Sequence, residues 1–342
     1  MLLSDNGREL TGTGGAKGTP GCAFGPSGPS RSNVCAAMSE LPASVRIREV
    51  GPRDGFQNEP EVLATDVKVR LIELLAATGV PRIELTSFVR PDVIPQLADA
   101  EQVLERVTLP AHISASVLIP NERGLERALR YRDRFSEISG FLSASETHNR
   151  HNVGRSTGES LDGLTRTFAR ARAEGLGCVA VIATSFGCPY EGQVPVQRVL
   201  ALASDLIAAG AHEIGFGDTT GMANPLQVRE FFVRARAALP SGTELTAHFH
   251  NTRGQGLANV LAALEAGVDS FESSFGELGG CPVPASATGN IASEDLVSML
   301  EEMGIATGID LPALIAAARA AQEALGRRLT SHLLSAGPVD WR

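Results

Sequence analysis

Apolar and polar positions alternate regularly along the chain from Val45 onward. Short runs rich in β-branched and aromatic residues predict eight strands: Val45–Val50, Arg82–Thr86, His112–Leu118, Glu137–Ser143, Cys178–Thr184, His212–Phe216, Glu244–Phe249 and Ser270–Ser274. Amphipathic stretches between them predict helices at Thr65–Thr78, Asp92–Arg106, Glu122–Tyr131, Ser160–Glu174, Pro195–Ala209, Pro225–Ala238, Gly256–Glu265 and Ser293–Met303. Eight strand-helix units in series predict an α/β fold, the closed (β/α)8 TIM barrel.

An open, doubly wound sheet is the alternative architecture. It calls for a Gly-x-Gly-x-x-Gly turn after the first strand, and Gly51-Pro52-Arg53-Asp54-Gly55 does not have that spacing. After the eighth unit, Leu311–Leu329 predicts one or two extra C-terminal helices that cover the barrel or a partner. Because these helices are apolar, we expect a homodimer.

The first 43 residues differ from the rest of the chain. They are dense in Gly, Ser and Pro and lack hydrophobic periodicity, which predicts a disordered, low-complexity extension in front of a barrel domain at 44–342. They also lack the apolar stretch of a signal peptide. Met38 stands just before the regular pattern, so we expect translation to begin there.

Composition narrows the class of protein. Apolar residues make up 43% of the 342 residues, enough for a packed core, and no apolar run is long enough to span a membrane. A net charge of -9 and an aromatic content of 5% argue against nucleic-acid binding. Five cysteines without a Cys-x-x-Cys pair indicate neither a disulfide framework nor a zinc ribbon, so we expect the cytoplasm.

Two histidines end the seventh predicted strand. Side chains two apart on a strand point to one face, so His248 and His250 project together and can bind a divalent cation, although one core and one loop histidine would give the same pattern. Asp54 and Asn290, which follow the first and eighth strands, can add oxygen ligands. Such a mixed nitrogen and oxygen set suits Mg2+ or Mn2+ better than a structural zinc ion.

Further polar residues stand at the strand ends, where TIM barrels place their chemistry. Arg53 offers a fixed cation beside Asp54, or the two form a solvated surface pair. Glu84 lies within an apolar strand, so it should face the barrel mouth or a cation such as Arg53. Asp218 lies near the predicted metal site or caps the turn that follows it.

Two loops carry further candidate chemistry. The polar loop Ser143–Asn152, which runs on to Arg155, either holds phosphates or is simply solvated. Cys281 stands between Gly280 and Pro282 in an exposed Gly- and Pro-rich loop, unlike most free cysteines, which are buried and inert.

Several motifs together resemble one enzyme family. They are Val50-Gly-Pro-Arg-Asp-Gly-Phe-Gln-Asn58, Thr86-Ser-Phe-Val89, Gly187-Cys-Pro-Tyr-Glu-Gly192, Gly217-Asp-Thr219, His248–Asn251 and Leu278-Gly-Gly-Cys-Pro282 followed by Gly289-Asn290. They resemble the 3-hydroxy-3-methylglutaryl-CoA lyases, part of a TIM-barrel metallolyase superfamily that also holds isopropylmalate and homocitrate synthases. The resemblance runs from about Val45 to Ser331, and the Gly-Gly-Cys-Pro loop is its specific element.

The resemblance implies cleavage of a 3-hydroxyacyl-CoA into an oxo acid and acetyl-CoA. It implies that Asp54, His248, His250 and Asn290 hold the cation, which binds the C3 hydroxyl and a carboxylate oxygen of the substrate. Arg53 would stabilise the enolate and Cys281 would act as general acid and base, while Glu84, Asp218 and Gln57 position Arg53 and the proton-transferring His248. No redox or pyridoxal cofactor is implied.

An acyl-CoA is anionic, so the acidic chain needs local positive charge. We expect Arg150, Arg155 and Arg253 to bind the CoA phosphates. Asn251 and Arg253 depart from the usual His-x-His-Asp-Thr-Tyr-Gly-Gln of the family, and Val283-Pro284 departs from its usual Tyr or Phe followed by Ala. The exact substrate therefore stays open between the methylglutaryl ester, another 3-alkyl ester and a citramalyl-type ester.

Two other functions remain as alternatives. A condensing acyl-CoA synthase of the same superfamily would run the chemistry forward, but it has its base outside the Cys loop and often a C-terminal regulatory domain. A non-catalytic barrel that serves as a scaffold would require every polar strand-end residue to be coincidental.

Overall fold

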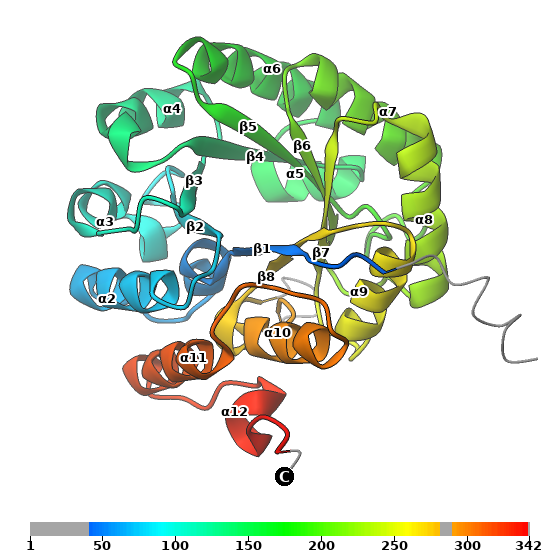
Figure 1. Ribbon diagram of the computed structural model, residues 1–342. Coiled ribbons are helices and arrows are strands. Elements are labelled where there is room, and N and C mark those ends of the chain that lie inside the picture. Colours follow the sequence, from blue (N-terminus) through cyan, green and yellow to red (C-terminus); the bar gives the residue numbers. More distant parts are fainter. Residues whose placement is uncertain (1–40, 281–288, 341–342) are drawn as a thin grey trace, which may run out of the picture. The chain divides into compact units, whose positions relative to one another are not determined.

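Eight parallel strands form a closed barrel in the computed structural model, which describes residues 41–280 and 289–340. The strands pair in chain order and β8 pairs with β1 (Figure 1). They are β1 Arg46–Glu49, β2 Arg82–Ser87, β3 Ser114–Leu118, β4 Glu137–Ser143, β5 Gly177–Ala183, β6 Glu213–Asp218, β7 Glu244–Phe249 and β8 Ser270–Ser273. The predicted TIM barrel is confirmed.

Helices surround the barrel and bury its apolar outer face. They are α2 Thr65–Ala76, α3 Ala100–Arg106, α4 Glu122–Ala128, α5 Glu146–Val153, α6 Thr157–Ala173, α7 Val196–Ala208, α8 Pro225–Ala238, α9 Gly256–Glu265, α10 Ser293–Glu302, α11 Leu311–Leu325 and α12 His332–Ala336. Within the predicted extra stretch Leu311–Leu329 lies α11, which packs against both α10 and α2 (Figure 1), and α12 follows just after that stretch. No helix in the described part of the chain is both long and apolar enough to cross a membrane.

The inside of the barrel is charged, whereas branched apolar residues usually fill this space. Arg48 of β1 is only 2% exposed, and both of its terminal nitrogens bind Glu213 of β6, at 2.9 and 3.0 Å. It also binds Glu137 at 3.1 Å and lies 3.5 Å from Glu272. Arg82 joins the same network through Glu213 and Glu244. Each buried carboxylate here therefore has a cation beside it.

We expect Arg48→Met to lower the free energy of unfolding by about 3–5 kcal/mol, because the change leaves buried carboxylates without their cation. Urea denaturation measures it. Arg166→Ala is the control, since its 3.2 Å pair with Glu122 is solvent-exposed and such pairs contribute at most about 1 kcal/mol. Equal effects of the two variants would contradict the stabilising role of the internal network.

The helix predicted at Asp92–Arg106 was wrong in its first half. That stretch contains a short 3-10 turn, Pro95–Leu97, and α3 begins only at Ala100. Pro95 lacks an N–H donor and keeps the preceding Ile94 out of the helical region, at φ -127° and ψ 80°. The apolar periodicity therefore continued across a segment in which the chain is not α-helical.

The polar stretch that follows β4 is largely helical, although we predicted a loop there. Ser145 caps α5 by accepting a hydrogen bond from the His148 N–H at 3.1 Å, and Gly154 ends the helix at φ 69°. Helix α6 begins at Thr157, three residues before its predicted start, because Ser156 and Glu159 form a capping box. The polar composition of α5 and of the first turn of α6 gave no apolar periodicity from which a helix could be predicted.

Candidate active site

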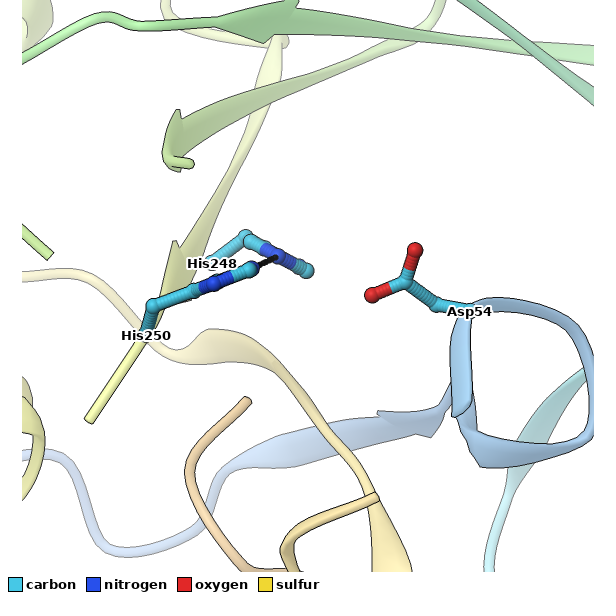
Figure 2. A group of neighbouring side chains, drawn as sticks. All are labelled: Asp54, His248 and His250. Atoms are coloured by element: carbon cyan, nitrogen blue, oxygen red, sulfur yellow. Dashed lines mark hydrogen bonds between the residues drawn. The ribbon is translucent and has the colours of Figure 1, made fainter. Parts of the chain in front are cut away.

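Three potential metal ligands converge at the mouth of the barrel. Asp54 lies in the π-helical turn Gly51–Gly55 that follows β1, and His248 and His250 lie at the end of β7. Ligand atoms of the three side chains all lie within 4.8 Å of one another, and the two Nε2 atoms are 3.1 Å apart. Figure 2 shows both imidazoles pointing toward the carboxylate. The predicted common face of the two histidines is confirmed.

Asn290 completes this group from a separate segment. A β-bridge pairs Asn290 with His250, and flanking backbone hydrogen bonds join Asn251 to Gly289 and Ile291 to Phe249. The Asn290 Nδ2 donates to Asp54 Oδ2 at 2.7 Å, while its Oδ1 is buried without a hydrogen-bond partner in the described part of the chain. An orphaned amide oxygen beside a carboxylate and two imidazoles fits a divalent cation.

Charge prepares these ligands for a cation. Burial alone raises the pKa of Asp54, but Arg53 and the two histidines lower it to about 2, so the carboxylate is ionised. Burial and the neighbouring His248 lower the pKa of His250 to about 3, which keeps its imidazole neutral. Burial lowers the pKa of His248, yet Glu272 and Asp54 raise it overall. The two carboxylates therefore favour the charged form of the His248 imidazole more than water does.

Glu272 is a site residue that we missed in the sequence. Its carboxylate lies 2.9 Å from His248 Nδ1, and its other oxygen lies 3.5 Å from Arg48. A carboxylate on the rear nitrogen fixes the ring and leaves Nε2 to face the ligand cluster. The sequence did contain a sign of this role, because Glu272 is an acidic residue within a buried strand. The same feature led us to predict a role for Glu84.

Arg53 lies beside the cluster and is held at two points. Its Nη1 donates to Asp54 Oδ1 at 2.6 Å, and its Nε donates to Glu84, which in turn accepts a hydrogen bond from Ser139. Burial opposes the charge on Arg53, but the two carboxylates raise its pKa above the ordinary value. Glu84 faces the Arg53 cation, one of the two environments predicted for it.

Asp218 ends β6 and performs the capping role that the sequence left open. Its Oδ1 accepts hydrogen bonds from the N–H groups of Met222 and Ala223, at 2.7 and 3.1 Å. Its Oδ2 is buried without a hydrogen-bond partner among the described residues, and burial raises the pKa of the carboxyl to about 6. The carboxyl of Asp218 therefore has a pKa close to neutral pH and can exchange a proton there.

A cavity of about 610 Å³ opens above these residues. Arg53, Asp54, Gln57, Glu84, His248 and His250 line it together with apolar side chains such as Val89 and Leu118. Of the three arginines predicted to bind phosphates, only Arg155 lies in this lining. Arg150 pairs with Glu146 at 2.8 Å, and Arg253 donates to the carbonyls of Thr220 and Gly221, both at 2.8 Å.

A second groove, of about 370 Å³, adjoins the cavity and shares Arg155, Arg90 and Asn121 with it. Three further arginines line this groove: Arg123, Arg127 and Arg166. Arg123 and Arg127 lie on α4 and Arg166 lies on α6, and the three form no basic run in the sequence, so charge patterning alone could not find them. The groove brings five arginines together beside the cavity, of which Arg90, Arg127 and Arg166 each pair with an acidic residue.

Comparisons with known proteins agree with this geometry. The HMGL-like family matches residues 44–320 of the chain. The chain belongs to the HMGL-like family. The hydroxymethylglutaryl-CoA lyase of Bacillus subtilis is 44% identical, over 86% of this chain and 97% of its own length. The (R)-citramalyl-CoA lyase of Chloroflexus aurantiacus is 43% identical, over 86% of this chain and 96% of its own.

Solved structures show the same likeness. The Bacillus subtilis HMG-CoA lyase superposes with a TM-score of 0.84 at 44% identity, and covers 86% of this chain and 98% of its own. An HMG-CoA lyase from Acinetobacter baumannii in complex with coenzyme A and 3-methylmalate gives a TM-score of 0.84 at 41% identity, covering 89% and 99%. The likeness thus spans the whole barrel rather than one motif.

Cys281, the predicted acid and base of the HMGL-like loop, lies outside the described residues, as do Val283 and Pro284. Just before it, Glu277 is buried and has φ 62°, a left-handed backbone conformation that costs a non-glycine residue of order 1–3 kcal/mol. Such strain persists only where surrounding contacts enforce it, which indicates that neighbouring residues hold Glu277 in this conformation.

A second group of potential ligands lies at the opposite end of the HMGL-like barrel. Glu137, His212 and Glu213 also bring ligand atoms within 4.8 Å of one another. Their charge is already compensated, because Arg48 binds both carboxylates and Arg82 binds Glu213. This group therefore fits an ion-pair network better than a metal, in contrast to the one at the mouth.

Proposed function

We propose that the chain is a divalent-metal-dependent carbon–carbon lyase that cleaves 3-hydroxy-3-methylglutaryl-CoA into acetoacetate and acetyl-CoA. The observation that carries the proposal is the convergence of Asp54, His248, His250 and Asn290 beside a fixed Arg53 in one cavity of an HMGL-like barrel. The names of relatives with 38–44% identity agree with this activity.

The reaction needs an alkoxide at C3 and a place for the negative charge of the departing group. Asp54, His248, His250 and Asn290 would hold a divalent cation, Mg2+ or Mn2+, which would supply Lewis acidity for loss of the C3 hydroxyl proton. When the hydroxyl loses its proton, the C2–C3 bond breaks, its electron pair moves into the thioester enolate, and C3 becomes the ketone of the oxo acid. Protonation of the enolate carbon then gives acetyl-CoA.

In this proposal Arg53 donates hydrogen bonds to the thioester oxygen, where charge develops as the bond breaks. Glu84 holds Arg53 and Glu272 holds His248, and we assign Gln57 and Asp218 supporting roles beside them. Asp218 can also take up or release a proton. Cys281 acts as the general acid and base. It protonates the enolate carbon or removes the hydroxyl proton.

Phosphates of coenzyme A require positive charge outside the reacting centre. We assign them to Arg155 and the arginine-lined groove that adjoins it, with Arg150 and Arg253 as more distant candidates. A homodimer and a cytoplasmic location stay predictions from the sequence, and the condensing synthase stays the alternative reaction.

Metal-dependent release of acetyl-CoA tests the proposal. We expect release from 3-hydroxy-3-methylglutaryl-CoA with Mg2+ or Mn2+, and a fall to background after chelation that the added metal reverses. The citramalyl ester should be assayed in parallel, because a relative named (R)-citramalyl-CoA lyase is 43% identical. Preference for that ester would move the substrate assignment, and no release from either ester would refute the lyase proposal.

A further inference from the structure

Glu277 makes one contact that explains its strained backbone. It lies in the 3-10 turn Phe275–Glu277 that follows β8, and its buried carboxylate accepts a hydrogen bond from Asn251 Nδ2 at 2.6 Å. Asn251 directly follows the ligand His250. The contact therefore joins the end of β7, which carries two ligands, to the turn after β8.

The Asn251 amide uses both its oxygen and its nitrogen at this contact, one as an acceptor and the other as a donor. Its Oδ1 accepts a hydrogen bond from the Gly256 N–H at 3.2 Å, at the start of α9, while its Nδ2 donates to Glu277. The aspartate that is usual at this position in the family could accept from Gly256, but it has no donor for Glu277. With both residues acidic, two carboxylates would face each other in a buried place.

The backbone that follows Glu277 packs against the fourth ligand. The Leu278 carbonyl accepts a hydrogen bond from Asn290 Nδ2 at 3.1 Å, which turns the opposite amide atom, Oδ1, away from that carbonyl. A side chain on Gly279 would meet Asn290 Nδ2 at 2.7 Å, and one on Gly55, next to Asp54, would meet Leu278 at 2.8 Å. Residues 277–279 thus pack closely against the segments that carry the ligands Asn290 and Asp54.

We propose that Glu277 is a positioning residue for the metal ligands Asn290 and Asp54, and that its hydrogen bond with Asn251 fixes the turn after β8 against β7. The strained conformation of Glu277 sets the direction in which Leu278 and Gly279 leave the turn. The Asn251 amide compensates the Glu277 carboxylate, so the two residues function as a pair. The inference rests on the metal site of the proposed function.

Mn2+ titration by calorimetry tests the pair without substrate. We expect Asn251→Asp to weaken Mn2+ binding about 10-fold, because it sets two carboxylates against each other, and Glu277→Gly to weaken it similarly, because it frees the turn. The double variant Asn251→Asp with Glu277→Gly should bind Mn2+ about as well as Glu277→Gly alone, because the turn stays freed but the repulsion is gone. Losses that do not multiply are not expected from two independent structural roles.

Folding and strain are controlled separately. Thr184 is the other non-glycine residue with a positive φ, 56°, among those described. Thr184→Gly removes this strain after β5, together with the hydrogen bonds of the Thr184 hydroxyl with Ser143 and Ser145, and should leave the Mn2+ affinity unchanged. The metal-free Tm of Glu277→Gly should not fall below that of Asn251→Asp.

Unchanged affinity in both single variants, or losses that multiply in the double variant, would overturn the inference. Failure of the wild type to bind Mn2+ would overturn it together with the metal site. A wild type that binds Mn2+ but cleaves neither ester would refute the proposed reaction, while the affinities of the variants would still decide the role of Glu277.

Discussion

Replacing Arg53 with glutamine is expected to lower kcat about 10³-fold. Loss of a preorganised donor aimed at developing negative charge costs roughly 3–4 kcal/mol in transition-state stabilisation. Arg53 is preorganised in this way because Glu84 and Asp54 hold two of its nitrogens, and Ser139 holds Glu84. Toward the substrate, the charge of the guanidinium acts mainly when the enolate forms, so the substrate KM should change much less than kcat.

Arg82→Gln is the matched control for this prediction. Arg82 also bridges two carboxylates, Glu213 and Glu244, and its side chain is 15% exposed, against 13% for Arg53, but it belongs to the opposite end of the barrel. We expect Arg82→Gln to lower the Tm and to leave kcat near wild type. Similar kcat losses in both variants would mean that Arg53 acts through the fold rather than on the enolate.

The barrel was predictable because its signals are local and repeated. Each strand-helix unit buries its own apolar face, so alternation in the sequence carries the topology without knowledge of distant contacts. The ligand group followed from one further rule, that parallel strands present their carboxyl ends at one mouth. His248 lies in β7 and His250 directly follows its last residue, Phe249, so the two side chains still share a face.

Contacts between distant segments could not be predicted. Glu272 holds His248 across a strand pair, and the groove beside the cavity combines arginines of α4 with Arg166 of α6. Arg253 was predicted to bind phosphate, and nothing in the sequence indicated that its Nη1 donates to the carbonyls of Thr220 and Gly221. The presence of an arginine in the sequence does not show which group its side chain binds in the fold.

The charged interior and the ligand group are physically continuous. Arg48 lies against Glu272, and Glu272 holds His248, so the ion pairs that fill the barrel also orient a ligand at its mouth. An apolar interior could stabilise the barrel equally well. It could not supply a rear hydrogen bond to His248, so this polar core serves the site as well as the fold.

Replacing His250 with alanine is expected to weaken Mn2+ binding by at least about 100-fold and to abolish metal-dependent turnover. Loss of residues that merely orient a ligand costs 10–100-fold, so loss of a ligand should cost no less. His250 is neutral because burial and His248 keep its pKa near 3, and its Nε2 faces His248 Nε2 at 3.1 Å. Calorimetric Mn2+ titration and the acetyl-CoA assay measure the two effects.

His212→Ala separates the two groups of potential ligands. His212 belongs to the group at the opposite end of the barrel, where it lies 3.3 Å from Glu137. If the metal binds at the mouth, His212→Ala retains wild-type Mn2+ affinity while His250→Ala loses it. The reverse pattern would place the cation in the ion-pair network and would refute the active site. Cys281→Ser should differ from both variants, because an acid and base that is no ligand loses turnover and keeps the metal.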